Sequence, residues 1–141
     1  MWSIISLARM RPSTKETAVY DPIAELVKVN PVPSIIVDMQ TLAIAVVNKA
    51  TLQMLGYAEQ ELAGRSILEL VPPEDIAAVE RAADEPPPEG ETFWRCFKKD
   101  GTMIHLKLRY RETIYQARPA RFVVAVESSL TPFADSGPSL S

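Results

Sequence analysis

The sequence predicts one α+β domain, in which a five-stranded antiparallel sheet carries short helices on one face and is preceded by a flanking helix. Three observations lead to this fold class. Short apolar runs at 34–37 and 42–47 have the length and composition of strands. Caps, glycines and prolines divide the segment 48–84 into several short helices. Asp100-Gly101 then separates two longer strand-like segments and is a strong hairpin signal.

Composition fits a single domain and excludes several classes of function. The chain has 141 residues, of which 47% are hydrophobic and 23% charged, as in ordinary globular proteins. A net charge of −3 gives no reason to expect nucleic acid or a membrane surface as a partner. No segment approaches the ~18 consecutive apolar residues of a membrane span. The apolar start, 1–7, is too short for the core of a secretory signal, so we expect a cytoplasmic location.

The stretch 30–64 carries the clearest local signals. Asn30-Pro31 ends whatever precedes it, because the residue before a proline is disfavoured in the helical conformation. Asp38 falls in the turn between the two apolar runs. Asn48 is placed to cap a helix, since its side-chain oxygen accepts a backbone N–H of the first turn. Gly56 is expected to end that helix in the left-handed conformation.

The N-terminal part divides into two pieces. Residues 1–20 are poorly patterned, whereas Asp21 and Pro22 suit the cap and first position of a helix at 21–29. The apolar residues on one face of this helix are Ile23, Leu26 and Val27. Such a stripe has to be buried against another part of the chain or against a second subunit.

Further short helices are expected at 59–62 and 66–70, and a longer one opens at Pro72 and ends before 86–90, which we interpret as an exposed loop. The remaining strands are expected at 91–98, 103–111 and 121–127. Residues 131–141 are rich in serine and proline and are expected to be a flexible tail.

The register of the hairpin at Asp100-Gly101 decides which side chains reach the interior. A turn with an even number of residues places Arg95 opposite Leu106 and Phe93 opposite Leu108, and cross-strand partners share a face. Arg95 would then project among apolar side chains, where a guanidinium needs a partner. It either holds an anionic ligand, or it belongs to an internal ion pair, an edge position or a different register.

The same register places Trp94, Cys96, His105 and Lys107 on the other face. A tryptophan and a cysteine there indicate that this face is partly covered, by the helix at 21–29 or by another chain. Cys96 and His105 are the single cysteine and histidine, so a disulfide within the chain and a multi-cysteine zinc site are excluded. Although this register puts them opposite each other, a cysteine nucleophile also needs an orienting group and an oxyanion site, and two ligands rarely make a metal site. We interpret both as ordinary sheet residues.

Several motifs follow one another at compatible spacing along the chain. They are Asn30-Pro31, Asp38, Asn48-Lys49-Ala50, Leu55-Gly56-Tyr57, Glu61-Leu62-Ala63-Gly64-Arg65, Pro73-Glu74-Asp75 and Lys98-Lys99-Asp100-Gly101-Thr102. Taken together over about residues 30–127, this order resembles the PAS domain, the sensory module of many bacterial signalling proteins. The predicted organisation is a segment at 1–20, a flanking helix at 21–29, a PAS-like domain at 30–130 and a tail at 131–141.

The resemblance implies a sensory or regulatory function in signal transduction rather than an enzyme. The module would bind a small ligand or a partner and pass its state through its termini to an effector, for instance the histidine kinase of a two-component system. Any catalytic effector would lie outside this chain. In this family the flanking helix often packs on the outer sheet face or on a second subunit, so a homodimer is expected. The alternative is a dimerisation or protein-interaction scaffold without a ligand.

No cofactor is predicted from the family subtypes. Haem-binding PAS domains commonly use a histidine on the long helix, and 73–84 contains none. Light sensors that form a flavin adduct carry a cysteine on the short helix before it, and 64–69 has none. Haem and covalent flavin are therefore disfavoured, whereas non-covalent flavin or a small organic ligand remains compatible with the sequence.

Two sets of residues follow as candidates. The residues expected to line an interior pocket, or else to form plain core, are Leu52, Leu55, Ile67, Phe93, Arg95, Leu106, Leu108 and Tyr110. The residues expected at an interface with another element or subunit are Ile23, Leu26, Val27 and Trp94. Metal-binding and catalytic residues are not predicted.

Overall fold

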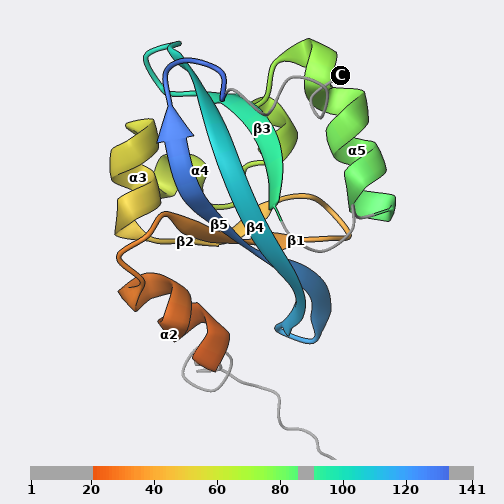
Figure 1. Ribbon diagram of the computed structural model, residues 1–141. Helices are drawn as coiled ribbons and strands as arrows, with labels where there is room; N and C mark the ends of the chain where they lie inside the picture. Colours follow the sequence, from red (N-terminus) through yellow and green to blue (C-terminus); the bar gives the residue numbers. More distant parts are fainter. Residues whose placement is uncertain (1–20, 86–90, 134–141) are drawn as a thin grey trace, which may run out of the picture.

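The fold is a single antiparallel sheet with helices on both sides (Figure 1). A computed structural model describes residues 21–85 and 91–133. The five strands follow the order β2-β1-β5-β4-β3 across the sheet. Their bounds are Ser34–Asp38 for β1, Ile44–Val47 for β2, Glu91–Phe97 for β3, Met103–Tyr115 for β4 and Arg118–Ser129 for β5. The predicted five-stranded α+β fold is confirmed.

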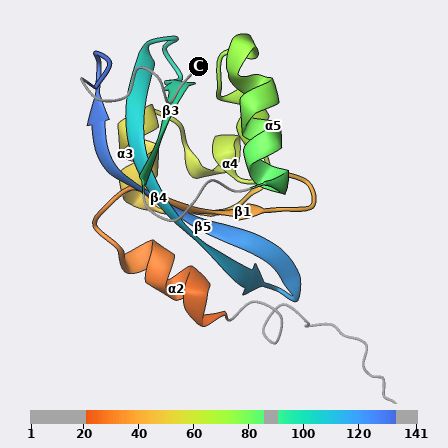
Figure 2. The same ribbon diagram turned by 45° about the vertical axis from the view of Figure 1, so that its right-hand side comes forward.

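The helices are unequally divided between the two faces of the sheet. Their bounds are Pro22–Val29 for α2, Lys49–Leu55 for α3, Glu59–Leu62 for α4 and Ile76–Asp84 for α5. Figures 1 and 2 show α3, α4 and α5 on the concave side of the curved sheet, and α2 alone on the opposite, outer side of β1 and β2. Two 3₁₀ turns, Ile67–Glu69 and Pro73–Asp75, complete the concave side.

The helix ends form as the sequence predicts. The Asp21 side chain accepts a hydrogen bond from the Ile23 backbone N–H at 3.1 Å and begins α2, with Pro22 in the first position. Asn48 accepts from the Thr51 N–H at 3.0 Å and begins α3. Gly56 ends α3 with a φ of 85°, in the left-handed region that glycine adopts without strain.

Asn48 does more than cap α3, because its buried side chain joins four segments. Its oxygen also accepts from the Ser34 N–H of β1 at 3.1 Å. Its amide nitrogen contacts the carbonyl oxygens of Val27 at 3.1 Å, Asn30 at 3.0 Å and Val32 at 2.8 Å. The end of α2, the 30–33 loop, β1 and α3 therefore share one hydrogen-bonding side chain, which fixes their relative positions.

Helix α2 packs on the outer sheet face. Val27 is 0% exposed and packs with Ile36, Val46 and Ala120, while Ile23 lies partly buried at the edge of this cluster. Leu26 points away from the sheet and is 61% exposed. Of the two alternatives for burying the stripe, the chain uses its own sheet for Ile23 and Val27.

The predicted register of the β3–β4 hairpin is wrong by one residue. Arg95 pairs with His105 and Trp94 with Leu106, because the connection between Phe97 and Met103 contains an odd number of residues. Gly101 adopts a φ of 89° in this connection, as glycine often does in hairpin loops with an odd number of residues. Because strand side chains alternate, this shift moves every β3 side chain to the opposite face.

Candidate functional site

An apolar cavity of about 160 Å³ lies between the concave sheet face and the helices. Strand residues that line it include Ile35, Val37, Ile44, Trp94, Cys96, Leu106, Leu108, Tyr110, Val123 and Ala125. Helical and loop residues that close it include Leu55, Leu62, Ile67, Leu70, Val79, Ala82 and Ala83. An enclosed apolar cavity of about 150 Å³ accepts a molecule the size of benzene. The volume is thus small but sufficient for a compact apolar ligand.

Most of the predicted lining residues reach this cavity. Leu55, Ile67, Leu106, Leu108, Tyr110 and Arg95 are part of its wall. Leu52 packs against the surrounding core cluster but is not a wall residue. Phe93 was placed inside by the wrong register; it pairs with Lys107 on the outer face, and its ring centroid lies 5.8 Å from that of Phe133.

The observed register moves Trp94 and Cys96 from the outer face, where they were predicted, to the concave face. Both were expected on the outer face, and Trp94 at an interface, whereas the observed register turns both into the cavity wall. Burial raises the pKa of the Cys96 thiol to about 12, so at neutral pH it is an uncharged, apolar wall group. His105 lies on the outer face, so Cys96 and His105 are not opposite each other.

Arg95 reaches the cavity from the edge strand β3 and is held there by carboxylates. Its Nε donates to Asp75 Oδ2 at 2.9 Å and its Nη2 donates to Asp75 Oδ1 at 2.7 Å, while Glu74 Oε2 lies 3.4 Å from Nη2. Hydrogen bonding to Asp75 raises the pKa of Arg95. The side chain of Asp75 is only 11% exposed. Its two-point contact with Arg95 is therefore an internal ion pair, one of the alternatives that the sequence allowed for Arg95. It ties β3 to the segment that begins α5.

Arg121 is a charged cavity residue that the sequence patterns did not predict. It lies on β5 opposite Glu112, and its side chain is 11% exposed. Its Nε donates to Glu112 Oε2 at 2.8 Å, its Nη1 donates to the Ala82 carbonyl at 3.2 Å, and its Cζ lies 5.0 Å from the centroid of the Tyr110 ring. The alternation in 121–127 held the signal, because Arg121 shares a face with the cavity residues Val123 and Ala125.

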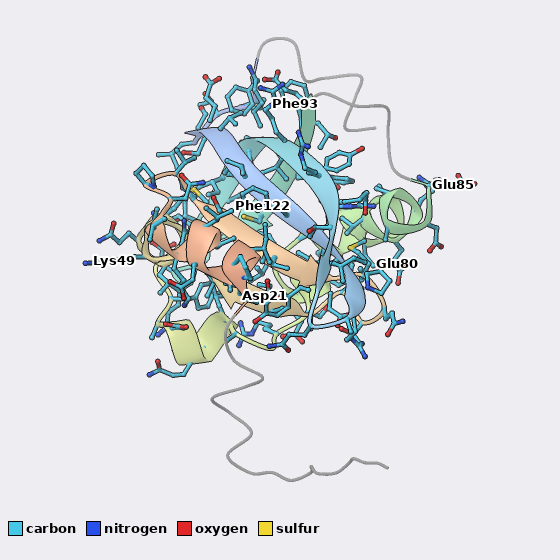
Figure 3. The ribbon with its side chains drawn as sticks, turned by 90° about the horizontal axis from the view of Figure 1, so that it is seen from below. Asp21, Lys49, Glu80, Glu85, Phe93 and Phe122 are labelled. Carbon is cyan, nitrogen blue, oxygen red and sulfur yellow. The ribbon has the colours of Figure 1, made fainter. Side chains whose placement is uncertain are left out.

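Helix α5 is therefore attached to the sheet at both ends. Arg95 holds its beginning through Asp75, and Arg121 contacts the Ala82 carbonyl in its last turn. Val79, Ala82 and Ala83 form its cavity-facing side. Glu80 of the same helix is exposed, and Figure 3 shows Glu85, the residue after α5, at the outer margin of the molecule. Helix α5 thus closes one side of the cavity through a mostly apolar surface.

The chemical character of the site is mainly apolar. Within residues 21–85 and 91–133, no group of three His, Cys, Asp or Glu side chains is arranged to hold a metal ion. The same described part of the chain contains no helix long and apolar enough to cross a membrane. What the arrangement offers chemically is apolar volume with two arginines at its margin.

Comparison with known proteins agrees with this architecture. The family model described as the PAS fold matches residues 23–127. Because the match covers most of the chain, the protein belongs to the PAS family, and the resemblance noted in the sequence is confirmed. A comparison with curated proteins found no significant match.

Solved structures with this fold share little sequence identity with the chain. A PAS domain from Desulfitobacterium hafniense has a TM-score of 0.64 at 20% identity, over 74% of this chain and 97% of that one. A PAS domain of an HTR-like protein from Haloarcula marismortui has a TM-score of 0.60 at 19% identity, over 80% and 93%. A PAS domain from a two-component sensor histidine kinase has a TM-score of 0.62 at 15% identity, over 76% and 93%. At these identities the likeness concerns the fold.

Proposed function

We propose that this chain is the sensory or regulatory module of a signal-transduction protein and binds a small, compact ligand in the cavity on the concave sheet face. The observation that carries the proposal is the apolar cavity of about 160 Å³, which is partly open to solvent and borders the buried core cluster. Ligand sites are typically concave, mostly apolar and reachable from solvent, so this cavity favours a ligand site over plain core. Haem and flavin are much larger than benzene, which favours a smaller ligand than either.

The proposed relay runs through the sheet to both ends of the domain. Strand β5 provides Val123 and Ala125 to the cavity, and Ala120 of the same strand packs beneath α2 on the other face. A ligand that shifts β5 would therefore alter the packing of the N-terminal helix as well as the position of the segment after Ser129. Such a bias requires the ligand to bind one arrangement better than the other.

The effector that receives this signal is proposed to lie in another domain or protein. A histidine kinase is one such effector, and a structurally similar PAS domain comes from a two-component sensor histidine kinase. We assign no catalytic step to this chain.

A dimerisation scaffold is the second candidate function, and the exposed side of α2 favours it. Leu26 and Val29 are large apolar residues on this helix that are left exposed by the chain itself. Replacing both, as Leu26→Glu and Val29→Glu, would convert a dimer into a monomer if this surface joins two copies. An unchanged molecular mass by light scattering would exclude α2 as the dimer contact.

The ligand proposal is tested with a neutral probe that matches the cavity. Toluene should raise the thermal unfolding midpoint of the protein, because a ligand that binds only the folded state stabilises it. The variant Ala83→Leu adds three carbon atoms to the cavity-facing side of α5 and should abolish this effect while the protein stays folded. Native mass spectrometry of freshly purified protein would reveal a ligand that is already bound. Absence of any bound molecule, together with no response to toluene, would contradict the proposal.

A further inference from the structure

We propose that the cavity selects a small carboxylate with an apolar body about the size of a benzene ring, and that Arg121 binds the carboxylate group. This inference rests on the proposed ligand-binding function and specifies the chemical class of the ligand. It depends on a difference between the two arginines at the cavity margin.

The guanidinium of Arg95 already has carboxylate partners within the protein. Its guanidinium makes a two-point contact with the largely buried Asp75 and has Glu74 as a further neighbour. Releasing Arg95 would leave the Asp75 carboxylate buried without its partner, which is costly. Arg95 is therefore a structural cation that fastens α5, and it is a poor anchor for an incoming anion.

Arg121 is held by a more exposed carboxylate, although its own side chain, at 11% exposed, is more enclosed than that of Arg95, at 24%. Its carboxylate partner, Glu112, has a side chain that is 55% exposed, and it contacts Arg121 through one oxygen at 2.8 Å. An exposed carboxylate returns to water at little cost, since such surface pairs are weak. A guanidinium has five N–H donors in a fixed plane, which suits two-point recognition of a second carboxylate.

The surroundings of Arg121 orient it toward the cavity. Val37 is its neighbour on β1, and both residues line the cavity. The Tyr110 ring, 5.0 Å from the guanidinium carbon, supports one side of the group. An anion next to this group would lie in a partly enclosed, low-dielectric setting, where attraction to a cation is stronger than in water.

The rest of the wall defines the ligand body. The neighbouring lining residues, among them Val79, Leu108 and Val123, are apolar. A volume of about 160 Å³ suits one aromatic ring or a short branched chain. Benzoate combines such a body with a carboxylate and is therefore the probe of choice, with toluene as its neutral counterpart.

The experiment measures benzoate and toluene binding by isothermal titration calorimetry on four proteins: the wild type, Arg121→Gln, Glu112→Gln and Arg111→Gln. We expect Arg121→Gln to weaken benzoate binding at least tenfold and to leave toluene binding unchanged. Glu112→Gln should tighten benzoate binding several-fold, because it removes the competing carboxylate. Arg111→Gln is the matched control, since Arg111 is an exposed arginine on the outer face of β4, and it should change neither affinity.

The outcomes separate this inference from the function on which it rests. Binding of toluene without measurable binding of benzoate would overturn the carboxylate assignment and leave the ligand-binding proposal intact. Equal loss of both probes in Arg121→Gln would show a packing role for Arg121 and also overturn it. If Arg121→Gln does not fold, Glu112→Gln becomes the deciding variant. An unchanged benzoate affinity of Glu112→Gln would contradict the proposal that benzoate competes with Glu112 for Arg121. Failure of the wild type to bind either probe would count against the proposed function itself.

Discussion

The two faces of the sheet are both apolar but are packed differently. On the outer face, Val27 of α2 closes over Ile36, Val46 and Ala120 and forms a small, filled cluster. On the concave face, a larger cluster of buried residues surrounds a cavity of about 160 Å³. One chain thus builds a closed core and a hollow core on opposite sides of a layer one strand thick.

The difference in packing has a consequence for stability. A void forfeits contacts between its walls and therefore costs stability, which a ligand can restore. The closed cluster under α2 has no empty volume to fill, so adding or removing side-chain volume there should lower the free energy of unfolding. Substitutions on each face therefore test this difference in packing.

The largest effect is expected at Asn48, which links both faces through α2, β1 and α3. Asn48→Ala leaves several buried backbone groups without partners and should lower the free energy of unfolding by about 3 kcal/mol or more. Denaturant unfolding monitored by circular dichroism measures it. Asn48→Asp keeps the acceptor that caps α3 but loses the amide donors. Its free energy of unfolding should therefore lie between those of the wild type and Asn48→Ala. Full stability of Asn48→Asp would mean that the contacts to α2 and the 30–33 loop contribute little.

A smaller effect is expected within α2 itself. Val27→Ala removes two carbon atoms from a completely buried site and should cost about 1–2 kcal/mol. Its neighbour Leu26 is 61% exposed, so Leu26→Ala should change stability by no more than about 0.5 kcal/mol. Chemical denaturation of both variants gives the comparison. Equal losses would indicate that Leu26 is buried in solution, as in a dimer.

Much of this fold is predictable because its signals are local. Asp21, Asn48 and Gly56 mark helix ends by side-chain or backbone chemistry that needs no knowledge of the rest of the molecule. The short strands and the hairpin at Asp100-Gly101 follow from equally short patterns. The wider role of Asn48 is different, since its contacts with Val27 and Ser34 exist only after distant segments meet.

The candidate site is less predictable because it depends on register and on distant packing. One residue more in the β3–β4 connection exchanges Phe93 for Trp94 at the cavity wall, and sequence spacing alone left both turn lengths open. Arg95 does not reach the cavity through the predicted register but through an ion pair around the sheet edge, one of the alternatives that the sequence left open. Arg121 was not predicted because the other face of its strand is the more apolar one in sequence, and Phe122 of that face packs beneath α2.

One substitution made at two positions of β5 tests most directly whether the outer face is filled and the concave face is hollow. Ala120 belongs to the closed cluster and Ala125 lines the cavity, so Ala120→Val and Ala125→Val add the same two carbon atoms to opposite faces. We expect Ala120→Val to lower the free energy of unfolding by about 1–2 kcal/mol through overpacking. Ala125→Val should leave it unchanged or raise it by up to about 1 kcal/mol, because the added methyl groups occupy empty volume. Equal destabilisation by both variants would contradict the account, since the concave face would then be as fully packed as the outer one.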